Sequence, residues 1–582
     1  MKVLLAHPED SPVDARWAEG GWDLVVDLGW AGAARYEEWA RRLGCPVRGM
    51  HGFGAGPGDF RRVREILRPG LGILVDEEGL DWWEILAPLR IHEMLNLVLV
   101  QRAVGEIAKG SWTGTRAHPV AELFGKISGT SVRYLERRNG PGVGSRWRDA
   151  ARRMSAGQML QTAFDKWDMD YRLRKLLARR RERVAGAAVL LPSGYVNVTR
   201  MLSAYARVLP EQRFLLVTTR ESGVMPELAA NIDQVSLAGF AGVPDRERVR
   251  KEKKALEATF GRWLATAERG CEELGWALAS GWFQKIGASL GQWLGIREAW
   301  RNVLEREEIQ AVLCGDENNP TNRIPVLLAR RKNLRTVHCD HGALDVLLAL
   351  RAPACDTYLV KGEMERDFLT RTSGVDPARV VKGAPPRPEL SGVLVAGPRE
   401  KGTIVFFSEQ YELTQGRTHI LYDEVLPRLC AVARRHGRRV VIKLHPFESR
   451  LLRSKFLETV LPLQERQAVE LVQGPLTESL LEDSWFAVTV ESSVTVDCAI
   501  RGIPCYVCRW FITPVAGYGE QFVRYGAAQE LATPDDVARI PEMLAGFRDE
   551  QAMQRLWSPI TAEKLAGALG KAPVDEALPQ RR

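Results

Sequence analysis

The chain has 582 residues, of which 45% are hydrophobic and 26% charged, with a net charge of +8 at neutral pH. This length is too great for one hydrophobic core and predicts two or three domains of an ordinary soluble globular protein. The modest basic excess suits anionic partners such as nucleotides or an acidic membrane surface. Basic runs such as Arg179-Arg180-Arg181 are expected to be solvated helix faces, and no nucleic-acid partner is predicted.

The cysteines and the apolar segments indicate a reducing compartment. Nine cysteines are scattered through apolar runs, which is typical of buried thiols and predicts no metal site. The first residues read as a strand rather than a signal peptide, and no apolar run approaches the length of a membrane span. We expect a cytoplasmic protein whose contact with the inner membrane, if it makes one, is peripheral on the cytoplasmic face.

Residues 1–185 read as an N-terminal Rossmann-like unit with a helical extension. Apolar runs at Lys2–Ala6, Asp23–Val26 and Gly72–Val75 predict strands, and the pattern from about residue 85 onward is helical and charged. The acids after the third run, Asp76-Glu77-Glu78, are expected to be solvated loop residues.

Residues 186–390 form the second predicted domain, with a long helical insertion at about 245–308. Short β-branched runs that alternate with helical patterns predict a parallel sheet here. The runs begin at Ala188, Phe214, Ala311, Thr336, Thr357 and Val380. Two of them end in polar residues, Asp316-Glu317 and Asp340-His341-Gly342. Because ligands of parallel sheets lie beyond the carboxyl ends of the strands, these residues are expected to face a cleft.

Residues 400–570 form the third predicted domain, after a connecting segment rich in Pro and Gly at 386–402. Its predicted strands are Thr403–Phe407, Val440–Leu444, Trp485–Val490 and Cys505–Cys508. The first ends in Ser408-Glu409-Gln410, the second in His445-Pro446, and the third is followed by Ser492-Ser493 at the start of a helix.

These strand ends suit a nucleotide phosphate. Free backbone N–H groups and the helix dipole attract an anion, and the Ser492 and Ser493 hydroxyls add donors. His445 can donate to the same phosphate, with Pro446 fixing its backbone. Asp497, one turn further on, could accept from a ribose hydroxyl. The alternative is that the serines are only helix caps and the histidine only a hydrogen-bonded strand end.

The combination resembles the GT-B-fold transferases that build bacterial surface polysaccharides. The similar groups are the polysialyltransferase and capsule Kdo-transferase types, with the related CDP-glycerol glycerophosphotransferases. The matching residues are Lys443-Leu444-His445-Pro446, Ser492-Ser493, Asp497 and Gly502-Ile503-Pro504, and the resemblance covers roughly 310–510. It implies an α/β fold of two Rossmann-like domains facing a cleft, here with an N-terminal α/β extension. It also implies that His445, Ser492 and Ser493 contact the donor phosphate. The strand end Val75-Asp76-Glu77-Glu78-Gly79 contains a three-residue acidic-acidic-Gly pattern that is similar to the motif supplying the catalytic base in polysialyltransferases.

We therefore predict a glycosyltransferase that moves a sugar from a nucleotide-activated donor to a surface-glycan or lipid-linked acceptor without a metal or other cofactor. A base must take the acceptor proton, and the candidates, which sequence alone does not rank, are Asp316, Glu317, Asp340 and His341. The alternative is that these polar strand ends are only tied into loop hydrogen bonds. Ser408, Gln410 and Arg417 are secondary candidates for the donor diphosphate. The open alternatives are a CDP-glycerol-type polyol-phosphate transferase, a UDP-sugar epimerase and a non-catalytic nucleotide- or glycan-binding scaffold.

Overall fold

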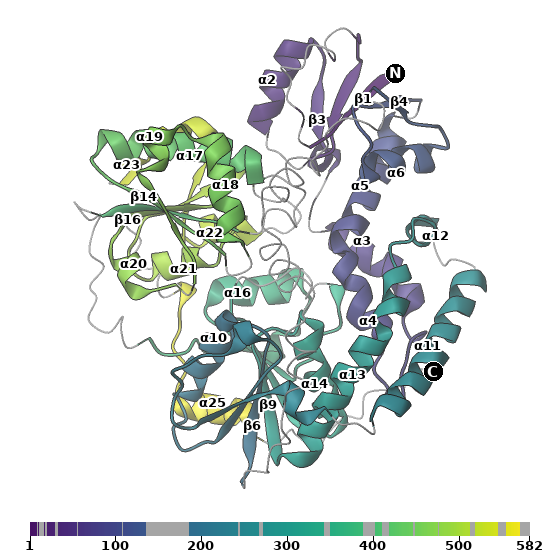
Figure 1. The fold of residues 1–582 in the computed structure, drawn as a ribbon, viewed down its shortest axis with the longest axis vertical. Helices are drawn as coiled ribbons and strands as arrows, with labels where there is room; N and C mark the ends of the chain where they lie inside the picture. Colours follow the sequence, from purple (N-terminus) through teal and green to yellow (C-terminus); the bar gives the residue numbers. More distant parts are fainter. Residues whose placement is uncertain are drawn as a thin grey trace.

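The computed structural model (Figure 1) is described for most of the chain, and every structural statement below refers to that part. The described residues are 1–8, 10, 17, 20–29, 33–54, 56, 58–107, 109–135, 186–241, 245–266, 272–342, 350–387, 402–409, 418–445, 448–474, 476–511, 518–544 and 555–570. Among the helices in these ranges, none is both long enough and apolar enough to span a bilayer.

The first of three parallel sheets is built from the N-terminal residues. Its strand order is β3-β2-β1-β4-β5, and apolar side chains fill both of its faces. The strands are β1 (Lys2–Ala6), β2 (Leu24–Asp27), β3 (Val47–Gly49), β4 (Ser111–Gly114) and β5 (Arg133–Tyr134). The accompanying α-helices are α2 (Ala33–Leu43), α3 (Gly58–Leu67), α4 (Trp82–Leu86), α5 (Ile91–Ile107) and α6 (Pro119–Ser128).

The second sheet has seven parallel strands in the order β12-β11-β10-β9-β6-β7-β8. They are β6 (Ala188–Ser193), β7 (Phe214–Thr218), β8 (Ile232–Ser236), β9 (Ile309–Cys314), β10 (Arg335–Cys339), β11 (Thr357–Val360) and β12 (Val380–Lys382). Six helices belong to this part of the chain: α10 (Val196–Ala206), α11 (Asp245–Thr266), α12 (Glu272–Ala279), α13 (Gln284–Arg306), α14 (Pro320–Arg331) and α16 (Glu363–Asp367).

The third sheet has six parallel strands in the order β15-β14-β13-β16-β17-β18. They are β13 (Thr403–Phe407), β14 (Val440–Lys443), β15 (Val469–Val472), β16 (Ser484–Thr489), β17 (Cys505–Cys508) and β18 (Gln529–Leu531). Its helices are α17 (Thr418–Arg435), α18 (Arg450–Val460), α19 (Leu463–Arg466), α20 (Glu478–Glu482), α21 (Val494–Ala499), α22 (Tyr518–Arg524) and α23 (Ile540–Met543). The chain then returns to the second sheet, and the apolar face of α25 (Ala562–Leu569) packs against that sheet (Figure 1).

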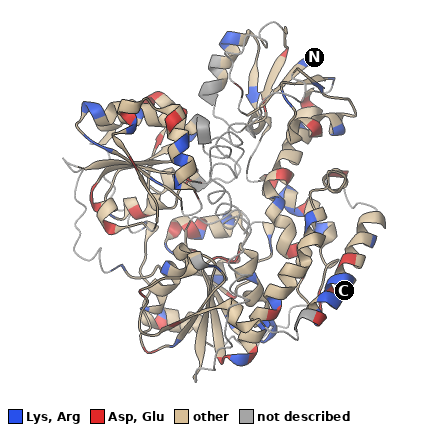
Figure 2. Ribbon diagram, viewed as in Figure 1, with Lys and Arg blue, Asp and Glu red and all other residues tan. Residues whose placement is uncertain are grey.

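The predicted fold class is confirmed: this is an α/β protein in which two Rossmann-like sheets face each other and an N-terminal α/β unit precedes them (Figure 1). Helices cover both faces of the second and third sheets, which is why their strands read as continuous apolar runs. Figure 2 shows that basic and acidic residues are interspersed over all three parts of the ribbon.

The prediction of a strand at Gly72–Val75 was wrong. Val75 makes only an isolated antiparallel bridge to Asp81, and the chain turns back there because the Asp76 carboxylate accepts from Leu80 N and Trp82 Nε1. Asp76 is also not a solvated loop acid. It is fully buried and forms an ion pair of 2.7 Å with Arg297 of α13, so it is not available as a catalytic base.

The topology of the second and third sheets places two ligand-binding edges opposite each other. In a doubly wound sheet the ligand binds where the strand order reverses, beyond the carboxyl ends of the two strands concerned. The reversal lies between β6 and β9 in the second sheet and between β13 and β16 in the third. These edges meet: a Cβ atom added to Gly342, beyond β10, would lie 3.3 Å from Ser493 Oγ, beyond β16.

Candidate active site in the interdomain cavity

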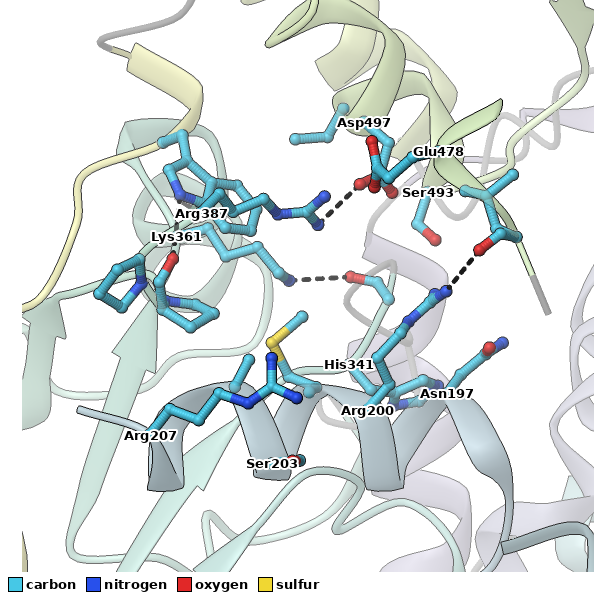
Figure 3. A pocket seen from close by; sticks show the side chains of 18 of the residues that line it. Asn197, Arg200, Ser203, Arg207, His341, Lys361, Arg387, Glu478, Ser493 and Asp497 are labelled. Carbon is cyan, nitrogen blue, oxygen red and sulfur yellow. Dashed lines mark hydrogen bonds and ion pairs between the residues drawn. The ribbon is translucent and has the colours of Figure 1, made fainter. Parts of the chain in front are cut away.

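A cavity of about 370 Å³ lies between the second and third sheets (Figure 3). Helix α10 forms one wall and the segments around α20 and α21 form the other. One side is closed by two chain segments that connect the second and third domains. The segment leaving the second sheet contributes Pro385, Pro386 and Arg387, and the returning segment contributes Trp557. Residues from both domains therefore contribute to a single site.

A hydrogen-bonded chain of three side chains lies at the edge of the second sheet. Tyr195 follows β6, Asp316 follows β9 and His341 follows β10, so each stands at a strand end near the reversal point. The Tyr195 hydroxyl lies 2.8 Å from Asp316 Oδ2 and 2.8 Å from His341 Nε2. This chain connects two of the predicted catalytic residues through a tyrosine that the sequence analysis did not identify.

The hydrogen bonds of His341 define how a proton can move along this chain. Nδ1 lies 2.8 Å from the Gly315 carbonyl, which only accepts, so Nδ1 carries a hydrogen. In the neutral ring Nε2 therefore has the lone pair. When Nε2 gains a proton it can donate to the Tyr195 oxygen, and the Tyr195 hydrogen can turn to Asp316. The arrangement is that of a general base supported by a carboxylate.

Asp340 and Glu317 are placed differently from these two residues. Asp340 is buried and accepts from Gly342 N at 2.9 Å, which fixes the loop after β10. Burial alone would raise the pKa of Asp340, but the His338 ring and the charges of His341 and Lys361 lower it to about 2. A carboxyl group with such a low pKa is a weak base. Asp340 is better suited to remain charged and to hold the loop after β10 in place.

Glu317 is turned into the protein interior and does not face the cavity, contrary to the expectation for both acids after β9. Its carboxylate is fully buried and accepts from Tyr358 Oη at 2.7 Å and from Ala354 N and Arg323 at 3.2 Å. With these donors in place, Glu317 holds the sheet and α14 together.

Ser493 is the serine that reaches the cavity. It stands at the start of α21, and its side chain makes no capping hydrogen bond to the helix. Ser492 is not part of the cavity lining; its Oγ lies 3.4 Å from Val494 N, in the role of a cap. The serine pair is therefore split, with one hydroxyl directed to the local backbone and the other left for a ligand.

Asp497 also lines the cavity, but it is already held by cations. Arg387 lies 2.7 Å from its carboxylate (Figure 3) and packs over the Trp557 ring. Arg501 lies 3.6 Å from the same carboxylate. Asp497 thus ties the third domain to the segment that leaves the second. A contact with ribose would have to share this ion pair.

His445 lies at the end of β14 but outside the lining of the cavity. Its backbone N–H donates to Glu448 Oε2 at 2.7 Å. Burial lowers the pKa of His445 to about 4, with further contributions from the charges of Lys443 and His341. The ring is therefore neutral at physiological pH. It stands close enough to His341 for their charges to interact.

Lys443 and Ser408 have structural partners. Lys443 Nζ donates to the carbonyls of Leu444 and Gly474 at 2.9 and 2.7 Å. Burial, and then the nearby charge of Arg200, lowers the pKa of Lys443 to about 8. Ser408 Oγ lies 2.9 Å from Glu448 and 2.8 Å from the Tyr422 hydroxyl, and it does not line the cavity.

Glu409, which follows β13, supports the loop that carries the serines. Its Oε1 accepts from Glu491 N at 2.8 Å and from Thr489 Oγ1 at 3.0 Å. Burial raises the pKa of Glu409 to about 7, and the neighbouring Glu448 adds to this rise. The carboxyl stands at the reversal point of the third sheet.

Three predicted residues, Pro446, Gln410 and Arg417, lie outside the described residues. Within the described part of the chain, no group of three or more His, Cys, Asp or Glu side chains is arranged to hold a metal ion.

Comparisons with known proteins gave likeness in structure only. No protein-family model matches the chain. No curated protein matches it in sequence. Among solved structures, a putative UDP-N-acetylglucosamine 2-epimerase from Listeria monocytogenes is 12% identical with a TM-score of 0.40, covering 66% of this chain and 94% of the other.

Two further solved structures give similar identities and TM-scores. The calicheamicin glycosyltransferase CalG4 is 15% identical with a TM-score of 0.35, covering 67% of this chain and 94% of its own. MurG from Acinetobacter baumannii is 11% identical with a TM-score of 0.36, covering 66% of this chain and 99% of its own. Because the sequence identities and TM-scores are low, we infer function from the site alone.

The residues that the sequence analysis missed are Tyr195, Arg200, Arg207, Lys361 and Glu409. Tyr195 and Glu409 follow apolar strands directly, so their position at a strand end was a usable signal. The arginines are different: on an amphipathic helix they read as an ordinary polar face, and only the opposing domain turns that face into a cavity wall.

Proposed function

We propose that the chain is a glycosyltransferase that uses a nucleotide-activated sugar donor and works in the interdomain cavity. The observation that supports this most directly is the Asp316–Tyr195–His341 chain, whose His341 lines the same cavity as Ser493. A base from one domain and a phosphate-binding wall from the other are what transfer between a nucleotide donor and a hydroxyl acceptor requires.

His341 is the proposed base. As the acceptor oxygen forms its bond to the anomeric carbon, its proton passes to the Tyr195 oxygen while the Tyr195 hydrogen passes to His341 Nε2, and the bond from that carbon to the donor phosphate breaks. The imidazolium is then stabilised by the Tyr195 oxygen, whose hydrogen turns to Asp316. Asp316 keeps this geometry because its other oxygen, Oδ1, accepts from Asn318 N and Asn319 N at 3.2 Å.

The leaving nucleoside phosphate keeps the bonding electron pair and needs positive charge and hydrogen-bond donors. Arg200 of α10 projects from the second domain across the cavity and donates to the Leu476 carbonyl of the third at 3.4 Å (Figure 3). Ser493 adds a hydroxyl from the opposite wall. The resemblance to surface-polysaccharide transferases supports a surface-glycan or lipid-linked acceptor.

A turnover assay tests the proposal. The purified chain is incubated with UDP-, CDP-, CMP- and GDP-activated donors and a pool of glycan acceptors, and nucleotide release is measured. His341→Ala is expected to lower turnover about 10²- to 10⁴-fold, as for loss of a general base. Tyr195→Phe keeps the ring but not the relay and should cost about tenfold.

The matched control is Tyr134→Phe in the first sheet, because the Tyr134 hydroxyl has no hydrogen-bond partner in the described structure. Its turnover should equal that of the wild type. Turnover that survives His341→Ala unchanged would overturn the assignment of the base. Donor consumption that needs no acceptor and yields an isomeric nucleotide sugar would instead identify an epimerase.

A further inference from the structure

The charges that line the cavity are not balanced locally. Four basic side chains face it, Arg200, Arg207, Lys361 and Arg387, against three acidic ones, Glu365, Glu478 and Asp497. Each acid has a cation of its own. Lys361 lies 2.6 Å from Glu365, Arg387 lies 2.7 Å from Asp497, and Arg501, behind the wall, lies 2.7 Å from Glu478.

Arg200 and Arg207 are left over from this pairing. Within the described part of the chain no carboxylate comes within ion-pair distance of either guanidinium, and the contact of Arg200 with the Leu476 carbonyl is a long one of 3.4 Å. Both side chains are exposed to the solvent of the cavity. An arginine cannot lose its charge at any physiological pH, so two permanent positive charges face the cavity without a carboxylate in ion-pair contact; the Asp497 and Glu478 carboxylates act on Arg200 from farther away.

The spacing of the two arginines restricts what could neutralise them. Arg200 lies in α10 and Arg207 is its C-cap residue with helical backbone angles, so the two are seven residues or nearly two turns apart, on one face and about 10 Å apart along the axis. In Figure 3, Arg200 lies on the side of His341 and Ser493, whereas Arg207 lies on the side of Lys361 and Arg387. Ser203 lines the cavity between them.

One diphosphate does not span this distance, because its two phosphorus atoms share a bridging oxygen. We infer that the cavity binds, in addition to the donor phosphate at Arg200, a second anionic group at Arg207. The second group belongs to the transferred sugar or to the acceptor and is a phosphate or a carboxylate. This rests on the proposed function for the identity of the first anion, and it gives the substrates an acidic character that the proposed function alone does not require.

Calorimetric titration of the full chain with two synthetic probes tests the inference. The probes are hexane-1,6-diyl bisphosphate, whose extended chain matches the spacing of the arginines, and hexyl monophosphate. The bisphosphate is expected to bind at least about tenfold more tightly, as for one additional charged hydrogen-bonding contact. In Arg207→Ala this advantage should fall to about one, and Arg207→Lys should restore part of it.

The control is Arg64→Ala, since Arg64 is an exposed arginine of α3 with no ion-pair partner in the described structure and lies outside the cavity. This variant should keep the full preference for the bisphosphate. Equal binding of the two probes to the wild type would overturn the inference. So would a preference that survives Arg207→Ala.

Two further titrations identify the source of the second anion. If it belongs to the donor, UDP-glucuronate will bind more tightly than UDP-glucose, and only while Arg207 is present. If it belongs to the acceptor, hexyl monophosphate will bind to the UDP-saturated protein, and again only while Arg207 is present. Failure of every nucleotide to bind, with the bisphosphate preference intact, would reject the proposed donor and leave the two-anion cavity standing.

Discussion

Around the cavity, some side chains are held by partners and others are available to a ligand. Asp340, Glu317 and Lys361 are saturated by hydrogen bonds and ion pairs within the second domain. Ser493, Arg200 and Arg207 face the cavity with capacity to spare, and His341 lines it with Nε2 in contact with the Tyr195 hydroxyl. The reactive groups are therefore few, and their neighbours fix the positions of the loops that carry them.

The buried carboxyl group of Glu409 leads to a prediction about how the stability of the protein depends on pH. Its pKa is raised from 4.5 to about 7 in the folded protein, chiefly by burial. Between these values the unfolded chain has released the proton and the folded protein still holds it, so the contribution of Glu409 to stability is lost as the pH rises. Glu409→Gln keeps an acceptor for Glu491 N without the ionisation. Its melting temperature relative to the wild type should therefore increase from pH 5 to pH 8.

Glu458→Gln, on the exposed face of α18, controls for the general effect of removing one negative charge. Its melting-temperature difference should stay nearly constant over the same range. A constant difference for Glu409→Gln as well would mean that Glu409 ionises like an exposed carboxyl and does not support the serine loop in the way described.

Sequence identified the strand ends but not which side chain at each end is available. His341 and Asp316 were among the predicted bases because polar residues after apolar runs gather at a sheet edge. The same rule could not separate Asp316 from Glu317, since the next residue along a loop can point in the opposite direction. Tyr195 completes the chain only because β6 and β9 are neighbours across 115 intervening residues, a pairing that no local pattern reveals.

Among the structural elements, most central strands were predictable and most edge strands were not; β12 is an edge strand that was predicted, and β4 is an inner strand that was missed. The runs at Lys2–Ala6, Thr403–Phe407 and Cys505–Cys508 correspond to strands with the predicted bounds, because both faces of these strands are buried. Most of the strands that were missed are at sheet edges: β3, β5, β8, β15 and β18. An edge strand is short and partly solvated, so its composition does not stand out from a loop.

The return of the C-terminal segment to the second sheet can be tested with two glycines. A Cβ atom at Gly362 would lie 2.2 Å from the Arg555 carbonyl oxygen and 2.6 Å from the Leu556 carbonyl carbon, both backbone atoms. Gly362→Ala should therefore lower the free energy of unfolding by about 1–3 kcal/mol, the usual cost of overpacking. Urea denaturation measures it.

Gly567 is the matched control, because it lies within α25 and a Cβ atom there would meet nothing within 4 Å. Alanine is the better helix former, so Gly567→Ala should raise the free energy of unfolding by about 0.5–1 kcal/mol. If the two substitutions shift stability in the same direction, the described packing of the returning segment is incorrect.

In the molecule as a whole, the N-terminal unit and the helical segment at 245–306 share one core. Trp83 of α4 packs against Phe260, Trp263 and Phe283 of that segment. Beside this aromatic cluster, the fully buried Arg297 lies 2.7 Å from Asp76 and Glu252 and 2.5 Å from Glu298. The unit is therefore attached through both apolar contacts and buried charge.

Arg297→Met should remove the charge that three buried carboxylates need. Breaking a buried pair by deleting one partner costs about 3–5 kcal/mol, because the remaining charge is left without compensation. The loss should be largest near neutral pH and smaller near pH 5, because burial raises the pKa of Asp76 and lets it take up a proton there. Arg64→Met, at an exposed position, should be nearly neutral throughout, and an equal effect of both variants on urea unfolding would contradict this role of Arg297.

The central claim is that the facing edges of the second and third sheets bind a nucleotide phosphate, with Arg200 reaching across to it. The most direct measurement is thermal unfolding of the wild type and Arg200→Ala with CMP, CDP, UDP and GDP and their sugar conjugates. A ligand that binds only the folded protein raises its melting temperature in proportion to the logarithm of its concentration. We predict such a rise for at least one nucleotide with the wild type and its loss with Arg200→Ala. No rise with any nucleotide, or an equal rise in both proteins, would contradict the account.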